Sequence, residues 1–74
     1  MTKEEFLEEL ASTLSENHLD ENRELGSVEL FDSTGLMSVL VMVDRLLGIR
    51  LNVDAMRDCK TVGDLVKLVA DKLV

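Results

Sequence analysis

The sequence contains no proline, tryptophan or tyrosine, and Phe6 and Phe31 are its only aromatic residues. Hydrophobic residues nevertheless make up 46% of the chain, mostly as Leu, Val and Met. A leucine-rich chain without proline and with few alternating β-branched residues is typical of helices. The composition therefore predicts an all-α fold.

Cysteine and long apolar runs are also scarce. Cys59 is the only cysteine, so no intramolecular disulfide or zinc cluster can form, and we expect a partly buried thiol in a reducing cytosol. The longest apolar run, Val39 to Val43, is far too short to cross a membrane. The first residues lack the apolar core of a signal peptide. We therefore expect a cytoplasmic protein without membrane insertion.

The length of 74 residues predicts one domain, residues 1–74, with no room for a second core. A chain of this size buries roughly 60% of its unfolded surface, so we expect no deep substrate cavity. We also expect a monomer.

Negative charge is concentrated in the first part of the chain, which has a net charge of −7 overall. Residues 1–31 hold nine acidic and two basic side chains, whereas residues 32–74 hold six of each. An acidic surface repels nucleic acid and anionic lipid, so neither is expected as a partner. Basic protein surfaces are the better candidates.

Helical periodicity begins directly after the N-terminus. Thr2 and Glu5 have the spacing of a capping box, and apolar residues then recur along one stripe, which predicts a helix over residues 3–16. Its acidic outer face is interpreted as a solvated surface. A last helix is expected over residues 62–73, after a second capping box that begins at Thr61.

The most apolar stretch of the chain predicts a second helix over residues 33–47, ended by Gly48. Within it, Met37 and Met42 suit either core filling or an adaptable contact surface. Asn52 is a candidate cap for one short helical turn that follows. The whole predicts a small four-helix bundle with three main helices and one short helix.

Residues 19–31 break the periodicity and predict a long ordered loop between the first two helices. We expect its isolated apolar residues to hold it against the core; they are Leu19, Leu25, Val28 and Leu30. A calcium loop counted from Asp20 fails, because Leu25 stands where glycine is required and Phe31 stands where glutamate is required.

Asp32 and Ser33 stand at the start of the second helix. Asp32 is a favourable N-cap residue, which places the Ser33 hydroxyl among unpaired backbone N–H groups at the positive end of the helix dipole. That setting suits a phosphate ester, although the pair also fits a simple helix cap. The sequence contains no catalytic set, and His18, the only histidine, has no cysteine or second histidine nearby.

The stretch from Asp32 to Leu51 resembles the acyl carrier protein family. The matching residues are Asp32-Ser33, an apolar helix that ends in Leu46-Leu47-Gly48-Ile49, and Leu51, and the similarity continues through Thr61-Val62-Gly63-Asp64-Leu65. The resemblance implies that Ser33 carries 4′-phosphopantetheine and that Asp32 is the acid preceding it. Neither Ser27 nor Ser38 follows an aspartate.

The resemblance also implies an apolar interior that shelters an acyl chain and a surface that partners contact. The interior residues would be Leu36, Leu40, Val43, Leu47, Leu51, Val62 and Leu65. The partner-binding residues would be Thr34, Met37, Ser38, Val41 and Asp44. The implied partners are a phosphopantetheinyl transferase, an acyl- or aminoacyl-loading ligase, and acyltransferase or synthase enzymes.

Two departures indicate a specialised carrier. The motif reads Asp-Ser-Thr-Gly, which is similar to that of D-alanyl carrier proteins, and Asp44 is nearly alone as an acid on the second helix. Housekeeping fatty-acid carriers present several acids there. We therefore expect a non-enzymatic carrier of acyl or aminoacyl groups, bound as thioesters, in a dedicated lipid, polyketide or cell-envelope pathway. The alternatives are an unmodified helical domain that binds a partner through its Leu/Met face, and a small metal binder, which the failed calcium loop disfavours.

Overall fold

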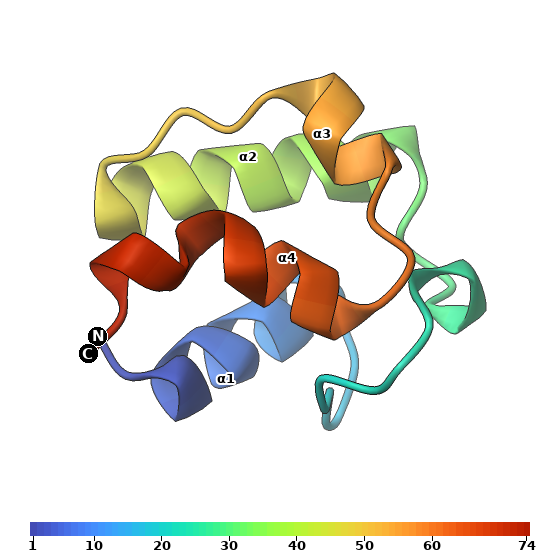
Figure 1. The fold of residues 1–74 in the computed structure, drawn as a ribbon. Coiled ribbons are helices and arrows are strands. Elements are labelled where there is room, and N and C mark those ends of the chain that lie inside the picture. Colours follow the sequence, from blue (N-terminus) through green and yellow to red (C-terminus); the bar gives the residue numbers. More distant parts are fainter.

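Four α-helices and two short 3₁₀ turns make up the regular structure of the computed structural model, which describes residues 1–74. The elements are α1 (Lys3–Thr13), η1 (Leu25–Ser27), α2 (Ser33–Leu47), α3 (Val53–Arg57), α4 (Val62–Val69) and η2 (Ala70–Lys72). In Figure 1, α4 lies between α2 above and α1 below, and the short α3 lies over one end of α2. The all-α prediction, with three main helices and one short helix, is confirmed.

Local side-chain caps begin the helices where the sequence predicts them. The Thr2 hydroxyl accepts the Glu5 N–H at 3.1 Å, and the Glu5 carboxylate accepts the Thr2 N–H at 2.9 Å. The N–H that Thr2 donates to the Glu5 carboxylate, with a further contribution from the Thr2 side chain, holds the pKa of Glu5 below its usual value. The Asn52 side-chain oxygen likewise accepts two N–H groups at the start of α3. Caps are strong local signals, so these starts could be read directly.

The cap of α4 has the same reciprocal geometry. Thr61 accepts the Asp64 N–H at 3.3 Å, and one Asp64 oxygen accepts the N–H groups of Lys60 and Thr61 at 2.9 and 3.2 Å. The two backbone donors lower the pKa of Asp64. The predicted α-helix to residue 73 is too long, because the α-helical pattern stops at Val69 and residues Ala70–Lys72 form a 3₁₀ turn. The two termini then meet, with the Val74 N–H donating to the Met1 carbonyl at 3.0 Å.

Helix α1 ends three residues earlier than predicted. Leu14 caps it, and Ser15 takes a left-handed backbone conformation with φ of 57°. The Glu16 N–H then donates back to the Ala11 carbonyl at 2.8 Å, which reverses the chain. Glycine or asparagine usually occupies such a left-handed position, so serine gave no stop signal in the sequence.

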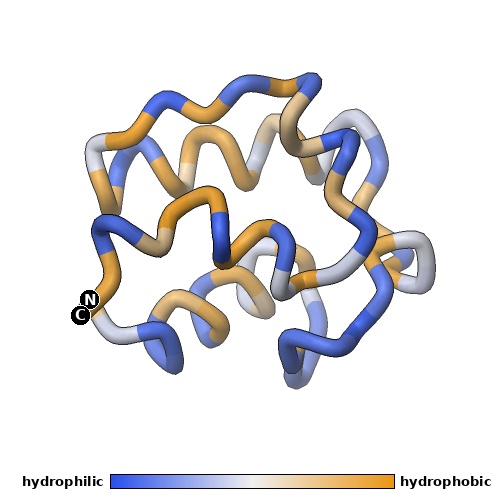
Figure 2. Tube along the Cα trace, in the orientation of Figure 1, coloured by the Kyte–Doolittle hydropathy of each residue, from blue (hydrophilic) through white to orange (hydrophobic).

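Sixteen buried apolar residues form one core between the helices and the α1–α2 loop. They are Phe6, Leu10, Ala11, Leu14, Leu19, Leu25, Val28, Leu36, Val39, Met42, Val43, Met56, Val62, Leu65, Val66 and Val69. Figure 2 shows apolar residues dominating α2 and α4, whereas hydrophilic residues dominate the loop after α1. Met42 belongs to the core and Met37 to the surface, so the two methionines of α2 have different roles.

The α1–α2 loop is anchored by backbone hydrogen bonds to the start of α4. The Leu25 N–H donates to the Lys60 carbonyl at 2.8 Å, and the Val62 N–H donates to the Arg23 carbonyl at 2.9 Å. Three of the four apolar loop residues are buried as expected. The prediction is wrong for Leu30, which is 43% exposed; its backbone carbonyl, and not its side chain, lies against α2 at Gly35.

Candidate functional site

Ser33 opens helix α2 with its hydroxyl at the surface. Asp32, the N-cap, has extended backbone angles, and its carboxylate accepts the Gly35 N–H at 3.0 Å. The Asp32 carbonyl accepts the Leu36 N–H at 2.8 Å. Asp32, Ser33 and Thr34 are all exposed. The expected cap is therefore present, and the serine beside it is accessible.

The start of α2 also fits a phosphate ester on Ser33. Capping uses the N–H groups of Gly35 and Leu36, but the N–H groups of Ser33 and Thr34 donate no hydrogen bond within the chain. These two donors and the helix dipole favour an anion at this end of the helix. Within the first turn of α2 itself there is no acidic side chain, and the Asp32 carboxylate at the cap is the acidic group next to Ser33.

The other two candidate hydroxyls have different surroundings. The Ser27 hydroxyl donates to the Glu24 carbonyl at 2.7 Å and accepts from the Arg23 guanidinium at 2.7 Å, so it holds the loop together. Ser38 is exposed but lies more than one helical turn inside α2. Neither residue has the helix N-terminus that surrounds Ser33.

Gly35 has a role that the sequence motif did not reveal. A Cβ atom built at Gly35 would overlap the carbonyl oxygen of Leu30, and it would lie 3.2 Å from the Leu14 side chain. The loop backbone therefore packs directly on the first turn of α2, in a space that only glycine leaves open. This contact holds the segment from Leu30 to Ser33 against the helix. Sequence reasoning noticed the glycine only as part of a motif.

Four of the five expected partner-binding residues lie together in one shallow groove. Thr34, Met37, Ser38 and Val41 line it with three further residues, and its volume is about 420 Å³; the further residues are Thr13, Met42 and Arg45. Met37 and Val41 are 57% and 64% exposed, although both side chains are large and apolar. We call this the α2 groove. It begins at the residue after Ser33 and contains no acidic side chain.

Asp44, the fifth expected partner-binding residue, lies outside the α2 groove. It lines a neighbouring groove of about 240 Å³ with Leu40, Val41, Arg50 and Leu51. Two arginines thus lie along this side of α2, because Arg45 borders the first groove and Arg50 the second.

The residues expected to line an acyl-binding interior fall into two groups. Four of them belong to the buried core, namely Leu36, Val43, Val62 and Leu65. Leu40, Leu47 and Leu51 are only half-buried and pack against that core from outside. Leu40 and Leu51 reach the surface in the groove beside Asp44. An acyl chain entering between the two groups would have to displace packed side chains, and this assignment stays a prediction.

Cys59 and the remaining ionisable groups show no second chemical centre. The Cys59 thiol is partly buried and donates to the Ala55 carbonyl at 3.4 Å. Burial, together with the negative charges of Asp64 and Asp58, raises the pKa of this thiol. No three His, Cys, Asp or Glu side chains gather as metal ligands, and no helix has the length and apolar character of a membrane span.

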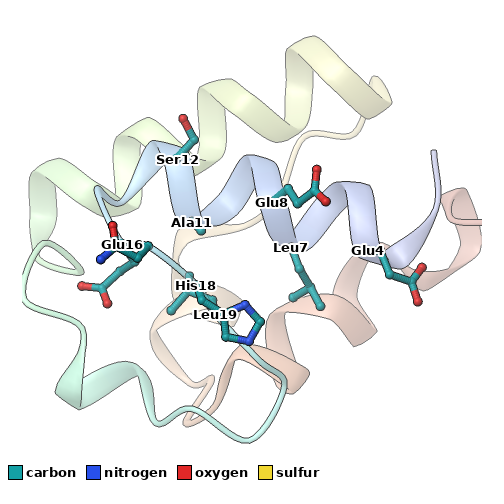
Figure 3. A pocket seen from close by; sticks show the side chains of 9 residues that line it. Glu4, Leu7, Glu8, Ala11, Ser12, Glu16, His18 and Leu19 are labelled. Carbon is teal, nitrogen blue, oxygen red and sulfur yellow. The ribbon is translucent and has the colours of Figure 1, made fainter.

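A further groove, which sequence reasoning missed, runs along α1 and residues 16–19 (Figure 3). Its volume is about 510 Å³, and its lining combines three apolar residues with acidic and polar ones. The acidic face of α1 gave no signal for a groove, because its shape depends on the turn at Ser15 that folds the next residues back. We call this the α1 groove.

Comparison with protein families identifies the chain. The family described as a phosphopantetheine attachment site matches residues 4–69. A comparison with curated proteins and one with solved structures each give no match. Domains of this family carry 4′-phosphopantetheine and are carriers rather than catalysts. The match spans all four helices, so the chain belongs to the family of phosphopantetheine-bearing carrier proteins, as its resemblance to acyl carrier proteins predicted.

Proposed function

We propose that Ser33 is the attachment site of the phosphopantetheine arm and that the protein is a specialised carrier of acyl or aminoacyl groups. The observation that carries the proposal is the exposed side chain of Ser33 at the start of α2. The backbone N–H groups of Ser33 and Thr34 have no hydrogen-bond acceptor in the chain. The oxygens of a phosphodiester at Ser33 would accept hydrogen bonds from those two N–H groups.

The residues around Ser33 act by positioning. Asp32 caps the helix through Gly35 and keeps the first turn formed, so the serine oxygen stays at the surface where a transferase reaches it. Gly35 lets the Leu30 backbone pack on the same turn. When bound, the arm supplies a thiol that holds the cargo as a thioester. The protein itself presents the arm.

The α2 groove is proposed as the surface that partner enzymes contact. These would be a phosphopantetheinyl transferase, a ligase that loads the cargo, and an acyltransferase or synthase that receives it. Met37 and Val41 provide exposed apolar contacts about one and two helical turns after Ser33, and methionine adapts its shape to different surfaces. Such interfaces are weak and transient, because one carrier visits several enzymes.

The specialised character is inferred from the charge of α2. Its only acidic residue, Asp44, lies next to Arg45. Enzymes that bind carriers through several acidic residues on this helix would therefore form few contacts with α2. We expect fatty-acid synthase enzymes to accept the loaded protein poorly compared with a housekeeping carrier. Efficient turnover by those enzymes would contradict the specialised assignment.

Intact mass measured before and after incubation with coenzyme A and a broad-specificity phosphopantetheinyl transferase tests the attachment site. We expect a gain of one arm in the native chain, no gain in Ser33→Ala, and an unchanged gain in the control Ser12→Ala, an exposed serine of α1 outside the α2 groove. A gain that survives Ser33→Ala would place the arm elsewhere. No gain in the native chain would favour the alternative of an unmodified interaction domain.

A further inference from the structure

The α1 groove has an apolar floor and an acidic rim. Leu7, Ala11 and Leu19 provide its apolar lining. Its polar lining consists of Glu4, Glu8, Ser12, Glu16, Asn17 and His18. Figure 3 shows Leu7 and the His18 ring on one side of α1, with the side chains of Glu8 and Ser12 projecting over its other side. The carboxylates of Glu4, Glu8 and Glu16 belong to the same lining, and Glu4 and Glu8 are exposed to solvent.

The negative charge of this rim is neutralised within the chain only at Glu16. Residues 1–31 contain two cations, and each lies in one ion pair. Lys3 pairs with Glu21 at 2.6 Å, and Arg23 pairs with Glu16 at 3.2 Å. Arg23 thus compensates the rim at Glu16 alone. Glu4 and Glu8 have no basic partner within 4.0 Å.

The unpaired acids at the rim also repel each other along α1. Glu4 and Glu8 are one turn apart on α1, and Glu5 and Glu9 form a second pair with the same spacing. Like charges at this spacing repel each other. The pair at the rim would be relieved by cations from outside, so the charge pattern is that of a surface shaped for a basic partner.

We propose that the α1 groove binds a basic amphipathic segment of a partner protein, with an apolar side chain on Leu7, Ala11 and Leu19 and lysine or arginine at Glu4 and Glu8. The rim selects cations, so nucleic acid and anionic lipid are disfavoured as occupants. The apolar floor adds a contact that simple charge attraction lacks. The inference goes beyond the carrier function and is independent of Ser33.

The α1 groove and the α2 groove share no lining residue, so a segment that lies within the α1 groove does not occupy the α2 groove. A carrier that binds one protein at α1 while another works at Ser33 would keep its cargo close to the next enzyme. Effective concentration rises when a second contact is made within one assembly.

Titration of the native chain with a synthetic amidated helical peptide of leucine and lysine, followed by backbone NMR shifts, tests the proposal. We expect saturable shifts centred on Leu7, Ala11 and Leu19, with the same affinity before and after arm attachment. The double variant Glu4→Gln/Glu8→Gln should bind about fivefold more weakly, because two exposed ion pairs are lost. The matched control Glu24→Gln/Glu29→Gln removes the same charge outside the groove and should bind like the native chain.

A second peptide, with alanine in place of leucine, tests the apolar floor and should bind more weakly at the same salt concentration. Equal weakening by both glutamine double variants, or shifts spread over the whole acidic half, would overturn the proposal in favour of diffuse attraction. Absence of saturable shifts would overturn it as well. Because the peptide titration does not require the arm, its failure is distinguishable from failure of the Ser33 assignment.

Discussion

Helices α1 and α2 present surfaces of opposite character within one small core. The exposed face of α1 carries four glutamates and no neutralising cation apart from Lys3, which pairs with the loop. The exposed face of α2 carries Met37 and Val41, and its charged residues are only Asp44 and Arg45. Charge acts over a Debye length of about 8–10 Å, whereas apolar contact requires surfaces to meet. Under the two docking proposals made above, α1 would attract partners from a distance and α2 would discriminate between them at contact.

The largest expected effect on stability comes from the contact between Gly35 in the first turn of α2 and the backbone of Leu30. The methyl group of Gly35→Ala would overlap the carbonyl oxygen of Leu30, so we expect the free energy of unfolding to fall by about 1–3 kcal/mol. Urea denaturation measures this change. Gly26→Ala is the matched control, because a Cβ there meets nothing within 4 Å and should not destabilise. Equal stability of the two variants would contradict the packing role of Gly35.

The apolar character of the α2 groove is tested by Met37→Ser/Val41→Ser. We expect the initial rate of arm transfer by a broad-specificity phosphopantetheinyl transferase to fall about tenfold, because exposed apolar contact is lost. Leu68→Ser removes an exposed apolar side chain from α4, outside the groove, and should leave the rate unchanged. If the rate of the double variant recovers at low salt, charge rather than apolar contact governs docking.

The capping carboxylates predict how stability depends on pH. Glu5 and Asp64 accept backbone N–H bonds that lower their pKa values in the folded chain. The unfolded chain therefore binds protons first as the pH falls, so the stabilisation is complete above the usual carboxylate pKa and is lost as the pH drops through the lowered values. Urea midpoints should decline in that acidic range, and Asp64→Ala should reduce the decline. A decline of the same size in Asp64→Ala would contradict the role of this cap.

The smallest expected effect concerns the charge pattern of α1. Glu8→Lys replaces a repulsive pair with an attractive one between positions 4 and 8, so the free energy of unfolding should rise by about 0.4–1 kcal/mol. Glu29→Lys makes the same charge change in the loop and provides the control. A loss of stability in Glu8→Lys would show that the acids of α1 serve the fold and not a partner.

Local chemistry made much of the fold predictable. Helix α2 begins after Asp32 and ends before Gly48, as expected. The side-chain cap at Asp32 and the left-handed glycine with φ of 68° are local signals that act within one helical turn. The capping pairs at Thr2 and Thr61 likewise mark the starts of α1 and α4. The position of Ser33 at a helix N-terminus followed from the same signals.

Other features depended on residues far apart in the chain. The end of α1 was mispredicted because the backward turn at Ser15 has no local signal. The loop is held by hydrogen bonds between residues 21–25 and 60–63, which no pattern in the loop reveals. Gly35 looked like a motif position until its contact with the Leu30 backbone was visible.

The sequence by itself determined the helix starts, the all-α class and the candidate serine, because caps and apolar periodicity act over a few residues. Only the tertiary structure decided which apolar side chains of α2 are buried and which are exposed, since Met42 and Met37 differ only in what packs on them. It also created the α1 groove, because a surface is formed by segments that meet in space. The acidic charge of that surface could be predicted from the sequence, but its shape could not.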